Sequence, residues 1–287
     1  MNDQVKGLLI TGLGVIFVSP DTLLIRLVDT DLWTTAFWRG LFTACGLTIL
    51  LLCTYGRRTP EIFRAIGAIG LLVVGIFVAT SFSFLSAVIH TTAANALIVL
   101  ATAPFFAAVL SSVFLKEAVP LRTWLAIAVA IAGITLIAWT SIGAGTLFGD
   151  FMALVTAGLL GLKITILRSR KAVNMIPALA ISSLIVALVA WPMGTPFAVS
   201  QTQMTWLLIM GFIVITPASA LIALGPRYIA APEVALLILL ETVLGPLWVW
   251  LVVLEEPSAL ALLGGTIVVT ALAVHAAMGL RFHRQLA

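Results

Sequence analysis

The amino-acid sequence predicts an all-α integral membrane protein with ten transmembrane helices. Its 287 residues are 62% hydrophobic and only 9% charged, and its mean hydropathy is +1.22. Soluble domains carry roughly a quarter charged residues, so this composition excludes a soluble enzyme, a nucleic-acid-binding protein and a disordered chain. A membrane span needs about 20 apolar residues, so that with its loop each span takes roughly 28 residues and the chain has room for about ten.

Helices, and not the strands of a β-barrel, are predicted to cross the membrane. Barrel strands alternate apolar and polar residues over short segments. This chain instead has unbroken apolar runs, such as Leu71–Ala79 and Ala126–Trp139. A helix satisfies its own backbone hydrogen bonds in lipid, so runs of this kind favour helical spans.

Charged residues and clusters of Pro and Gly separate these apolar runs. They predict spans at residues 6–26, 33–54, 66–88, 92–114, 121–141, 147–168, 176–194, 205–225, 232–254 and 258–280. The first run lacks a small-residue cleavage site, so we expect an uncleaved first span and no signal peptide. Cys45 and Cys53 lie about 12 Å apart along one predicted helix, too far apart for a disulfide.

The basic residues predict how the chain is oriented. Twelve of the fifteen lie on one side of the predicted membrane: Lys6, Arg57, Arg58, Arg64, Lys116, Arg122, Arg168, Arg170, Lys171, Arg227, Arg281 and Arg284. The opposite loops carry Arg26 with Asp29, Asp31, Asp150, Glu255 and Glu256. Basic residues concentrate in cytoplasmic loops, so we expect a multi-pass protein of a bacterial-type inner (plasma) membrane with both termini in the cytoplasm. The net charge of +4 therefore reflects topology, and no nucleic-acid partner is expected.

The fourth and ninth predicted spans resemble each other. Aligning Thr102 with Glu241, an offset of 139 residues, places a small-residue entry, an apolar helix and a closing acidic residue in register. Each of the two spans also contains a proline, Pro104 or Pro246. The alternative is that two membrane helices look alike through composition alone.

An offset close to half the chain predicts two repeats, residues 1–143 and 144–287, of five helices each. Five is odd, so the second repeat is expected to be inverted in the membrane relative to the first. Inverted repeats are typical of secondary transporters, whose substrate site lies near the midplane between the repeats.

Several motifs resemble the EamA branch of the drug/metabolite transporter superfamily. They are Trp38-Arg39-Gly40, Ser86-Ala87, Thr91–Leu97, Ala103-Pro104-Phe105-Phe106, Phe114-Leu115-Lys116-Glu117 and Glu241-Thr242-Val243 leading to Glu255-Glu256. The sequence departs from the family pattern at Thr242, where proline is usual, and at Glu255, where glycine is usual. The resemblance implies two EamA-like halves in a ten-helix carrier of small metabolites. Among these carriers the chain looks most like the aromatic amino-acid exporters of the YddG type.

Four ionisable residues fall inside predicted spans: Asp21, Arg39, Lys163 and Glu241. Each charge at a helix centre costs roughly 2.5–3.5 kcal/mol, so these residues are expected to face a cavity or one another. Asp21 and Arg39 fall near the outer face, and Lys163 and Glu241 in the inner half. We predict one ion pair at each level, with the two pairs closing the pathway alternately. Purely structural pairing, and extension of Arg39 toward the interface, are the alternatives.

Glu241 has a further potential role, because it is the carboxylate nearest mid-depth. It could exchange a proton for substrate, or serve as a structural hydrogen-bonding group. Prolines within or beside the spans are expected to bend their helices and to border the binding site: Pro20, Pro104, Pro217, Pro226, Pro232 and Pro246.

A substrate site is predicted between the fourth and ninth spans, flanked by the third and eighth. The candidate substrate-binding residues are Phe17, Trp38, Arg39, Ser83, His90, Asn95, Thr102, Lys163, Glu241 and Trp248. An amino acid carries both charges. Arg39 or Lys163 is expected to bind its carboxylate, and Glu241 its ammonium group.

The predicted function is export of amino acids by alternating access around a central cavity. We expect no cofactor and no metal, because the sequence has no ATP-binding loop and its histidines lack metal-ligand spacing. Small-residue spacings such as Ala126-x-x-x-Ala130 are typical of close helix contacts, within the chain or across a homodimer. The alternatives are a drug or nucleotide-sugar carrier and a membrane-embedded enzyme.

Overall fold

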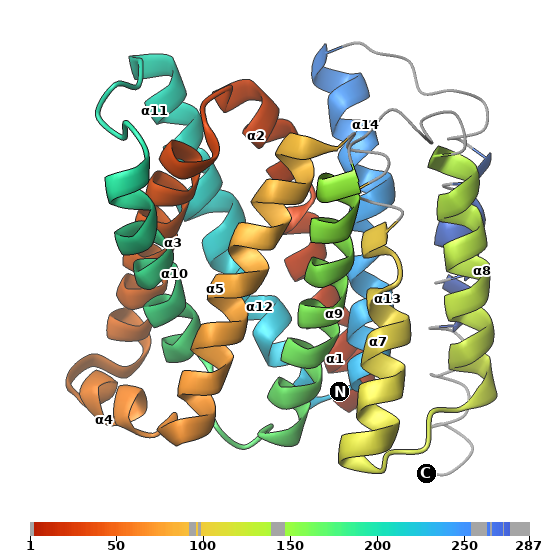
Figure 1. Ribbon diagram of the computed structural model, residues 1–287. Helices are drawn as coiled ribbons and strands as arrows, with labels where there is room; N and C mark the ends of the chain where they lie inside the picture. Colours follow the sequence, from red (N-terminus) through yellow and green to blue (C-terminus); the bar gives the residue numbers. More distant parts are fainter. Residues whose placement is uncertain are drawn as a thin grey trace.

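The computed structural model describes residues 3–91, 96, 99–138, 147–253, 263–264, 266–271 and 273–275. Every regular element in these ranges is helical, and the long helices run side by side between two ends of the molecule (Figure 1). Asn95, Glu255, Glu256, Arg281 and Arg284 lie outside the described residues.

Successive spans of the first half alternate in direction (Figure 1). The helices are α1 (Asp3–Val18), α2 (Asp21–Val28), α3 (Leu32–Tyr55), α4 (Thr59–Arg64), α5 (Gly67–His90), α7 (Ala103–Leu110), which continues into a π-helical turn (Ser111–Leu115), and α8 (Leu121–Ala138). Pro20 lies between α1 and α2 and has no N–H to continue the backbone ladder, so the first span breaks at Ser19–Pro20.

The second half continues the alternation. Its helices are α9 (Leu147–Ser169), α10 (Ile176–Ala190), α11 (Gln201–Leu208), a π-helical segment (Ile209–Ile215), α12 (Thr216–Leu224), α13 (Ala231–Ile238) and α14 (Glu241–Val253). A turn at Leu239–Leu240 separates α13 from α14, so the ninth predicted span is interrupted in its middle.

Seven helical segments of the described chain are long and apolar enough to cross a membrane. They are Asp3–Val28, Leu32–Arg64, Gly67–His90, Leu147–Ser169, Ile176–Met193, Gln201–Arg227 and Ala231–Val252. Three shorter apolar helices, Ala103–Leu115, Leu121–Gly133 and Thr266–His275, fall in the remaining predicted spans. The chain is thus a multi-pass helical membrane protein, and the total of ten spans stays a prediction.

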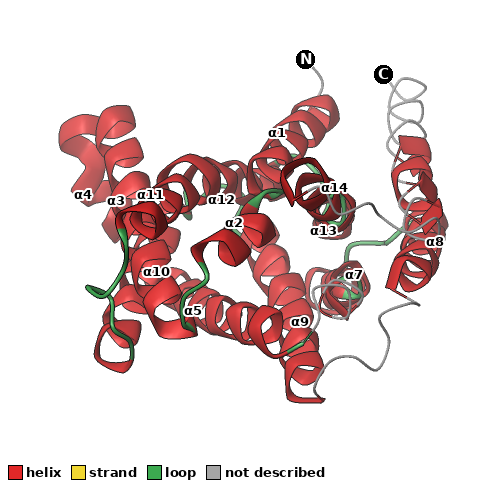
Figure 2. Cartoon of the chain, turned by 90° about the horizontal axis from the view of Figure 1, so that it is seen from above, coloured by secondary structure: helices red, strands yellow, loops and turns green. Residues whose placement is uncertain are grey.

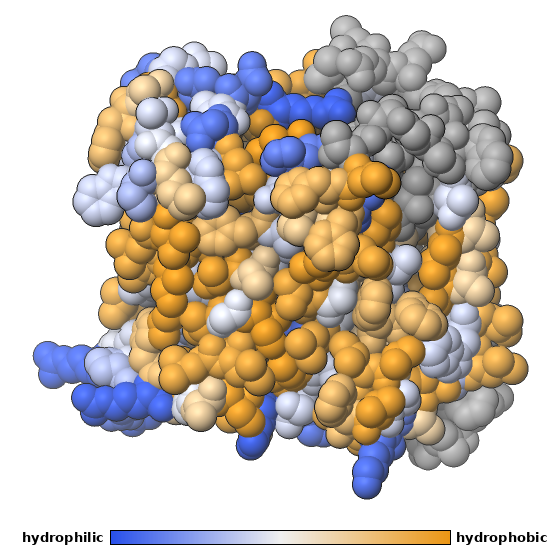
Figure 3. Space-filling view, viewed as in Figure 1, coloured by the Kyte–Doolittle hydropathy of each residue, from blue (hydrophilic) through white to orange (hydrophobic). Residues whose placement is uncertain are grey.

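Polar and apolar surfaces segregate as a membrane requires. Hydrophobic side chains cover the middle of the molecule, and hydrophilic ones gather at its two ends (Figure 3). The lower end in Figure 1 holds the 3₁₀ turn Gly56–Arg58, α4 and the connection from α9 to α10. These segments carry Arg57, Arg58, Arg64, Arg170 and Lys171. The upper end holds α2 and the start of α9, with Asp29, Asp31 and Asp150. We call these the basic end and the acidic end.

Helices from the two halves pack against each other in a regular pattern. In the order of the predicted spans, the second contacts the seventh (α3 with α10), the third contacts the sixth (α5 with α9), the first contacts the eighth (α1 with α12) and the fourth contacts the ninth (α7 with α13). Exchanging the two halves maps this set of contacts onto itself. Such a pattern is expected of an inverted repeat, although the repeat itself stays a prediction.

The small-residue face of α8 is used inside the chain. Ala126 and Ala130 are buried, and a Cβ placed on Gly133 would lie 2.9 Å from the Val268 side chain. Figures 1 and 2 both place α8 at the edge of the molecule farthest from α4. Ala126 and Ala130 belong to a buried cluster inside the chain with Ala108, Leu236 and Val268, which leaves the homodimer without support from this face.

Candidate functional site

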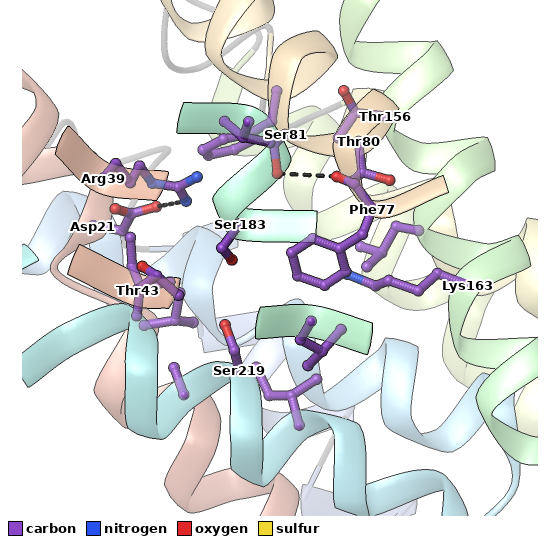
Figure 4. A pocket seen from close by; sticks show the side chains of 18 of the residues that line it. Asp21, Arg39, Thr43, Phe77, Thr80, Ser81, Thr156, Lys163, Ser183 and Ser219 are labelled. Carbon is purple, nitrogen blue, oxygen red and sulfur yellow. Dashed lines mark hydrogen bonds and ion pairs between the residues drawn. The ribbon is translucent and has the colours of Figure 1, made fainter. Parts of the chain in front are cut away.

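A cavity of about 150 Å³ lies among the packed helices (Figure 4). Most of its wall comes from α3, α5, α9, α10 and α12, and single residues of α1, α2, α13 and α14 complete it. Its polar lining residues are Asp21, Arg39, Thr43, Thr80, Ser81, Thr156, Lys163, Ser183, Ser219 and Glu241. The remaining lining is apolar. All four intramembrane ionisable residues singled out in the sequence therefore face one space, whereas separate pairs at two levels were predicted.

An ion pair occupies one wall of the cavity. Arg39 donates a hydrogen bond from a terminal guanidinium nitrogen to Oδ2 of Asp21 at 2.9 Å (Figure 4). The break at Ser19–Pro20 makes Asp21 the first residue of α2, which brings its carboxylate toward α3. The Asp21 side chain is only 2% exposed and that of Arg39 16%, so the pair is held away from bulk water. The predicted pairing of Asp21 with Arg39 is present in the structure.

Three buried polar atoms on this wall lack a hydrogen-bond partner in the described structure. They are Oδ1 of Asp21, Nε of Arg39 and Oγ1 of Thr43. A buried polar group without a partner costs about 1–3 kcal/mol, so such atoms are commonly satisfied by water or by a ligand. The wall thus offers both acceptor and donor atoms to a polar molecule in the cavity.

Lys163 contacts an aromatic ring and not the partner predicted for it. Its ammonium nitrogen lies 4.2 Å from the centroid of the Phe77 ring (Figure 4). Within the described residues no ion pair of 4.0 Å or less joins Lys163 to Glu241. The predicted pair is therefore absent from this structure, because the side chain of Lys163 points to α5.

Glu241 is the first residue of α14 and lies directly after the interruption of the ninth span. It is only 8% exposed and lines the cavity. Thr242 donates its hydroxyl proton to the carbonyl of Leu239 at 2.7 Å. The fourth span has the same arrangement, since it turns at Ala101–Thr102 and Thr102 donates to the carbonyl of Val99 at 2.7 Å.

The other sequence-predicted residues do not line the cavity. Trp38 donates its indole N–H to the Pro196 carbonyl at 2.7 Å and stacks on Phe42. Trp248 donates to Oγ of Ser19 at 2.7 Å. His90 lies at the acidic end, where its Nδ1 is 2.9 Å from the Ser86 carbonyl.

Three further candidates also lie outside the lining. Ser83 is buried beside it and accepts a hydrogen bond from Thr156, which does line it, at 2.8 Å. Thr102 caps its own turn, and Phe17 is half-buried in α1. Asn95 falls outside the described residues.

Sequence reasoning missed the small hydroxyl residues of the cavity. Thr43, Ser183 and Ser219 line it without having been candidates. Hydroxyls within apolar spans are the available signal. That signal is ambiguous, because Ser and Thr in helices also bond back to their own backbone, as Thr80 does with the Ile76 carbonyl.

The first half of the chain matches a known transporter family. Residues 5–139 match the model of the EamA-like transporter family. This range runs from α1 through α8, and it supports a transporter of the drug/metabolite superfamily. None of the curated proteins matches the chain.

One solved structure, described only as a crystal structure of a protein, shares the fold of the whole chain. Its TM-score is 0.81 at 15% sequence identity, and the alignment covers 96% of this chain and 98% of the other. A likeness at this identity concerns the fold alone. The aligned region includes the helices after residue 139 as well as those before it.

Proposed function

We propose that the chain is a secondary transporter that moves amino acids across the inner membrane, in the export direction, by alternating access around the central cavity. The observation that carries the proposal is the set of charges around this cavity. Asp21 and Arg39 neutralise each other, which leaves one cation, Lys163, and one carboxylate, Glu241, on the same lining. A zwitterion carries one charge of each sign and so matches these two remaining charges.

The contact between Lys163 and Phe77 supports this assignment. A cation over an aromatic ring gains about 0.5–2 kcal/mol, less than a charge-assisted hydrogen bond in a dry site. The carboxylate of a bound amino acid would therefore draw the Lys163 ammonium away from the ring. Its α-ammonium group would then pair with Glu241.

The size of the cavity favours a small cargo. Pockets for drug-sized ligands are about 300–1,000 Å³, whereas this one is about 150 Å³. A nucleotide sugar would also require several converging cations for its phosphates. Arg39 is already paired here, so the amino-acid assignment fits better than the drug or nucleotide-sugar alternative.

The extent of the lining supports alternating access. Leu167, Leu179 and Ala223 line the cavity within one turn of the basic ends of α9, α10 and α12. The Asp21–Arg39 pair lies toward the acidic end. With the basic end in the cytoplasm, as the charge bias favours, the cavity extends inward and the Asp21–Arg39 pair lies on its outward side.

Ligand-induced stabilisation and counterflow test the proposal together. An amino acid that binds the folded protein raises its apparent melting temperature, and the same compound is expected to exchange unmodified across proteoliposomes. Lys163→Met and Glu241→Gln should abolish both signals. Lys171→Met and Glu61→Gln, at exposed positions of the basic end, should leave both intact.

Each alternative gives a different result. Chemical conversion of the solute would indicate a membrane-embedded enzyme. Binding of drugs or nucleotide sugars without amino acids would reassign the cargo. If solute exchange by the Glu241→Gln variant still depends on pH, this carboxylate is not the group that couples proton movement to transport.

A further inference from the structure

A second, smaller void adjoins the central cavity. It has a volume of about 10 Å³, close to the space of one water molecule. Three residues line both spaces: Phe84, Leu100 and Thr156. The two voids are therefore neighbours that share one partition.

The second void lies on the acidic side of the partition. Ala87 and Val88 belong to the last turn of α5, and Ala153 lies in the second turn of α9, which begins at the acidic end. Thr22, in the first turn of α2, completes this part of the lining. These walls are mostly small side chains, so the void continues from the cavity toward the acidic end between α2, α5 and α9.

Of the three shared residues, Phe84 has the largest side chain, which is partly buried and packs against two hydrophobic clusters. Thr156 is fixed by hydrogen bonds to Ser83 and to the Met152 carbonyl, both 2.8 Å long, and Leu100 is 8% exposed within a packed cluster. The Phe84 side chain is half-buried, and its ring centroid lies 5.9 Å from the guanidinium carbon of Arg39. An aromatic ring of this kind clears a passage by a change of rotamer, with the backbone in place.

We infer that Phe84 is the side chain that separates the central cavity from a solute route to the acidic end, between α2, α5 and α9. The route serves as the outward path of the transport proposed above and rests on that proposal for its cargo. The barrier itself follows from the shared lining, and it is measurable without a substrate.

Thiol accessibility tests the barrier. The background is Cys45→Ser with Cys53→Ser, which removes both native cysteines. The reporter is Ala153→Cys, which lines the second void and not the cavity. The protein is placed in lipid nanodiscs, which leave both faces accessible, and is treated with a small cationic methanethiosulfonate. A separate variant, Ser219→Cys, reports whether the reagent enters the cavity. Replacing Phe84 by Ala should raise the modification rate of the Ala153→Cys reporter by roughly tenfold or more, because the partition is removed.

Phe82→Ala is the matched control. Phe82 lies on the same helix and is also half-buried, but its ring packs on Trp33 and lines neither void. The inference would be overturned if the Ala153→Cys reporter were modified at the same rate with Phe84 and with Phe84→Ala. It would also be overturned if Phe82→Ala accelerated this modification as much as Phe84→Ala does. If Phe84→Ala does not fold, Phe84→Leu should accelerate labelling and Phe84→Trp should slow it. If the unaltered protein exchanges no amino acid but the labelling result is as expected, the proposed transport is wrong and the barrier at Phe84 is still supported.

Discussion

Arg168 on α9 joins Glu117 and Pro226 at the basic end. Its Nε donates to Oε1 of Glu117 at 3.0 Å, and its NH1 donates to the Pro226 carbonyl at 3.1 Å. Ser111 donates to the other carboxylate oxygen of Glu117 at 3.3 Å. One guanidinium thus ties together the ends of the fourth, sixth and eighth predicted spans.

Glu117→Gln should lower the melting temperature of the purified protein. The substitution removes the negative charge that balances Arg168, whose side chain is only 18% exposed. A hydrogen bond to a charged group contributes about 1.5–3 kcal/mol, and part of it is lost. Glu61→Gln, an exposed glutamate at the same end of the molecule, is the control and should melt like the unaltered protein. Equal melting of both variants would contradict a stabilising role for the pair.

Asp21 and Arg39 should show energetic coupling. In a double-mutant cycle with Asp21→Asn and Arg39→Gln, we expect an interaction energy on the order of 1–3 kcal/mol in unfolding free energy, because either single change leaves the other charge buried without its partner. The control cycle combines Asp21→Asn with Lys6→Gln, because the Lys6 ammonium lies over the Tyr228 ring and not beside Asp21. The two changes in unfolding free energy should be additive in this control. Additivity in the first cycle as well would show that the two charges do not depend on each other.

Gly40 should not tolerate a methyl group. A Cβ at this position would lie 2.6 Å from the Ser183 carbonyl oxygen and 2.9 Å from the Ala187 amide nitrogen, both backbone atoms of α10. Gly40→Ala is therefore expected to cost about 1–3 kcal/mol of stability by forcing α3 and α10 apart. Gly75 on α5 has no atom within 4 Å of such a Cβ. Gly75→Ala should be neutral, or stabilise by up to about 1 kcal/mol; comparable losses in thermal melts of both variants would refute the contrast.

Asp31 should make the start of α3 sensitive to acid. Its partial burial alone would raise the pKa of the carboxyl, but hydrogen bonds from Thr34 and Trp33 outweigh burial and hold this pKa below its ordinary value. The resulting stability is present above the ordinary pKa and is lost as the pH falls through the lowered one. Asp31→Ala is expected to cost about 1 kcal/mol at neutral pH through loss of the cap, and Asp31→Asn much less.

Melting curves recorded from neutral to acidic pH check this expectation. Asp31→Asn should show a smaller loss of stability on acidification than the unaltered protein, because an amide does not titrate. An identical acid profile for both proteins would mean that the Asp31 cap does not contribute to the pH dependence.

Span positions were predictable because lipid constrains length and polarity together. The predicted spans 147–168 and 176–194 differ by one residue at one end from the helical segments Leu147–Ser169 and Ile176–Met193. Proline predicted the break at Ser19–Pro20, since it lacks an N–H group. It did not predict the turn at Leu239–Leu240, which precedes Pro246 by several residues.

The charged part of the site was predictable for a similar reason. Unsolvated charge is so costly in a membrane that Asp21, Arg39, Lys163 and Glu241 had to share polar surroundings. Aromatic side chains such as those of Trp38 and Trp248 can pack against other protein side chains or against lipid. The sequence alone therefore does not determine the direction in which they point. The rotation of each helix about its axis comes from long-range packing, and it decided which candidates reached the cavity.

The hydrogen bond from Trp248 to Ser19 has a mechanical consequence. Ser19 is the hinge residue between α1 and α2 and also donates to the Ile16 carbonyl at 2.8 Å. Trp248 belongs to α14, the part of the ninth span that begins with Glu241. The bond therefore ties α14 to the break in the first span that positions Asp21, so we expect a tilt of α14 to shift Asp21. The two carboxylates of the cavity are thus connected through the protein by a single indole, in addition to the space that they share.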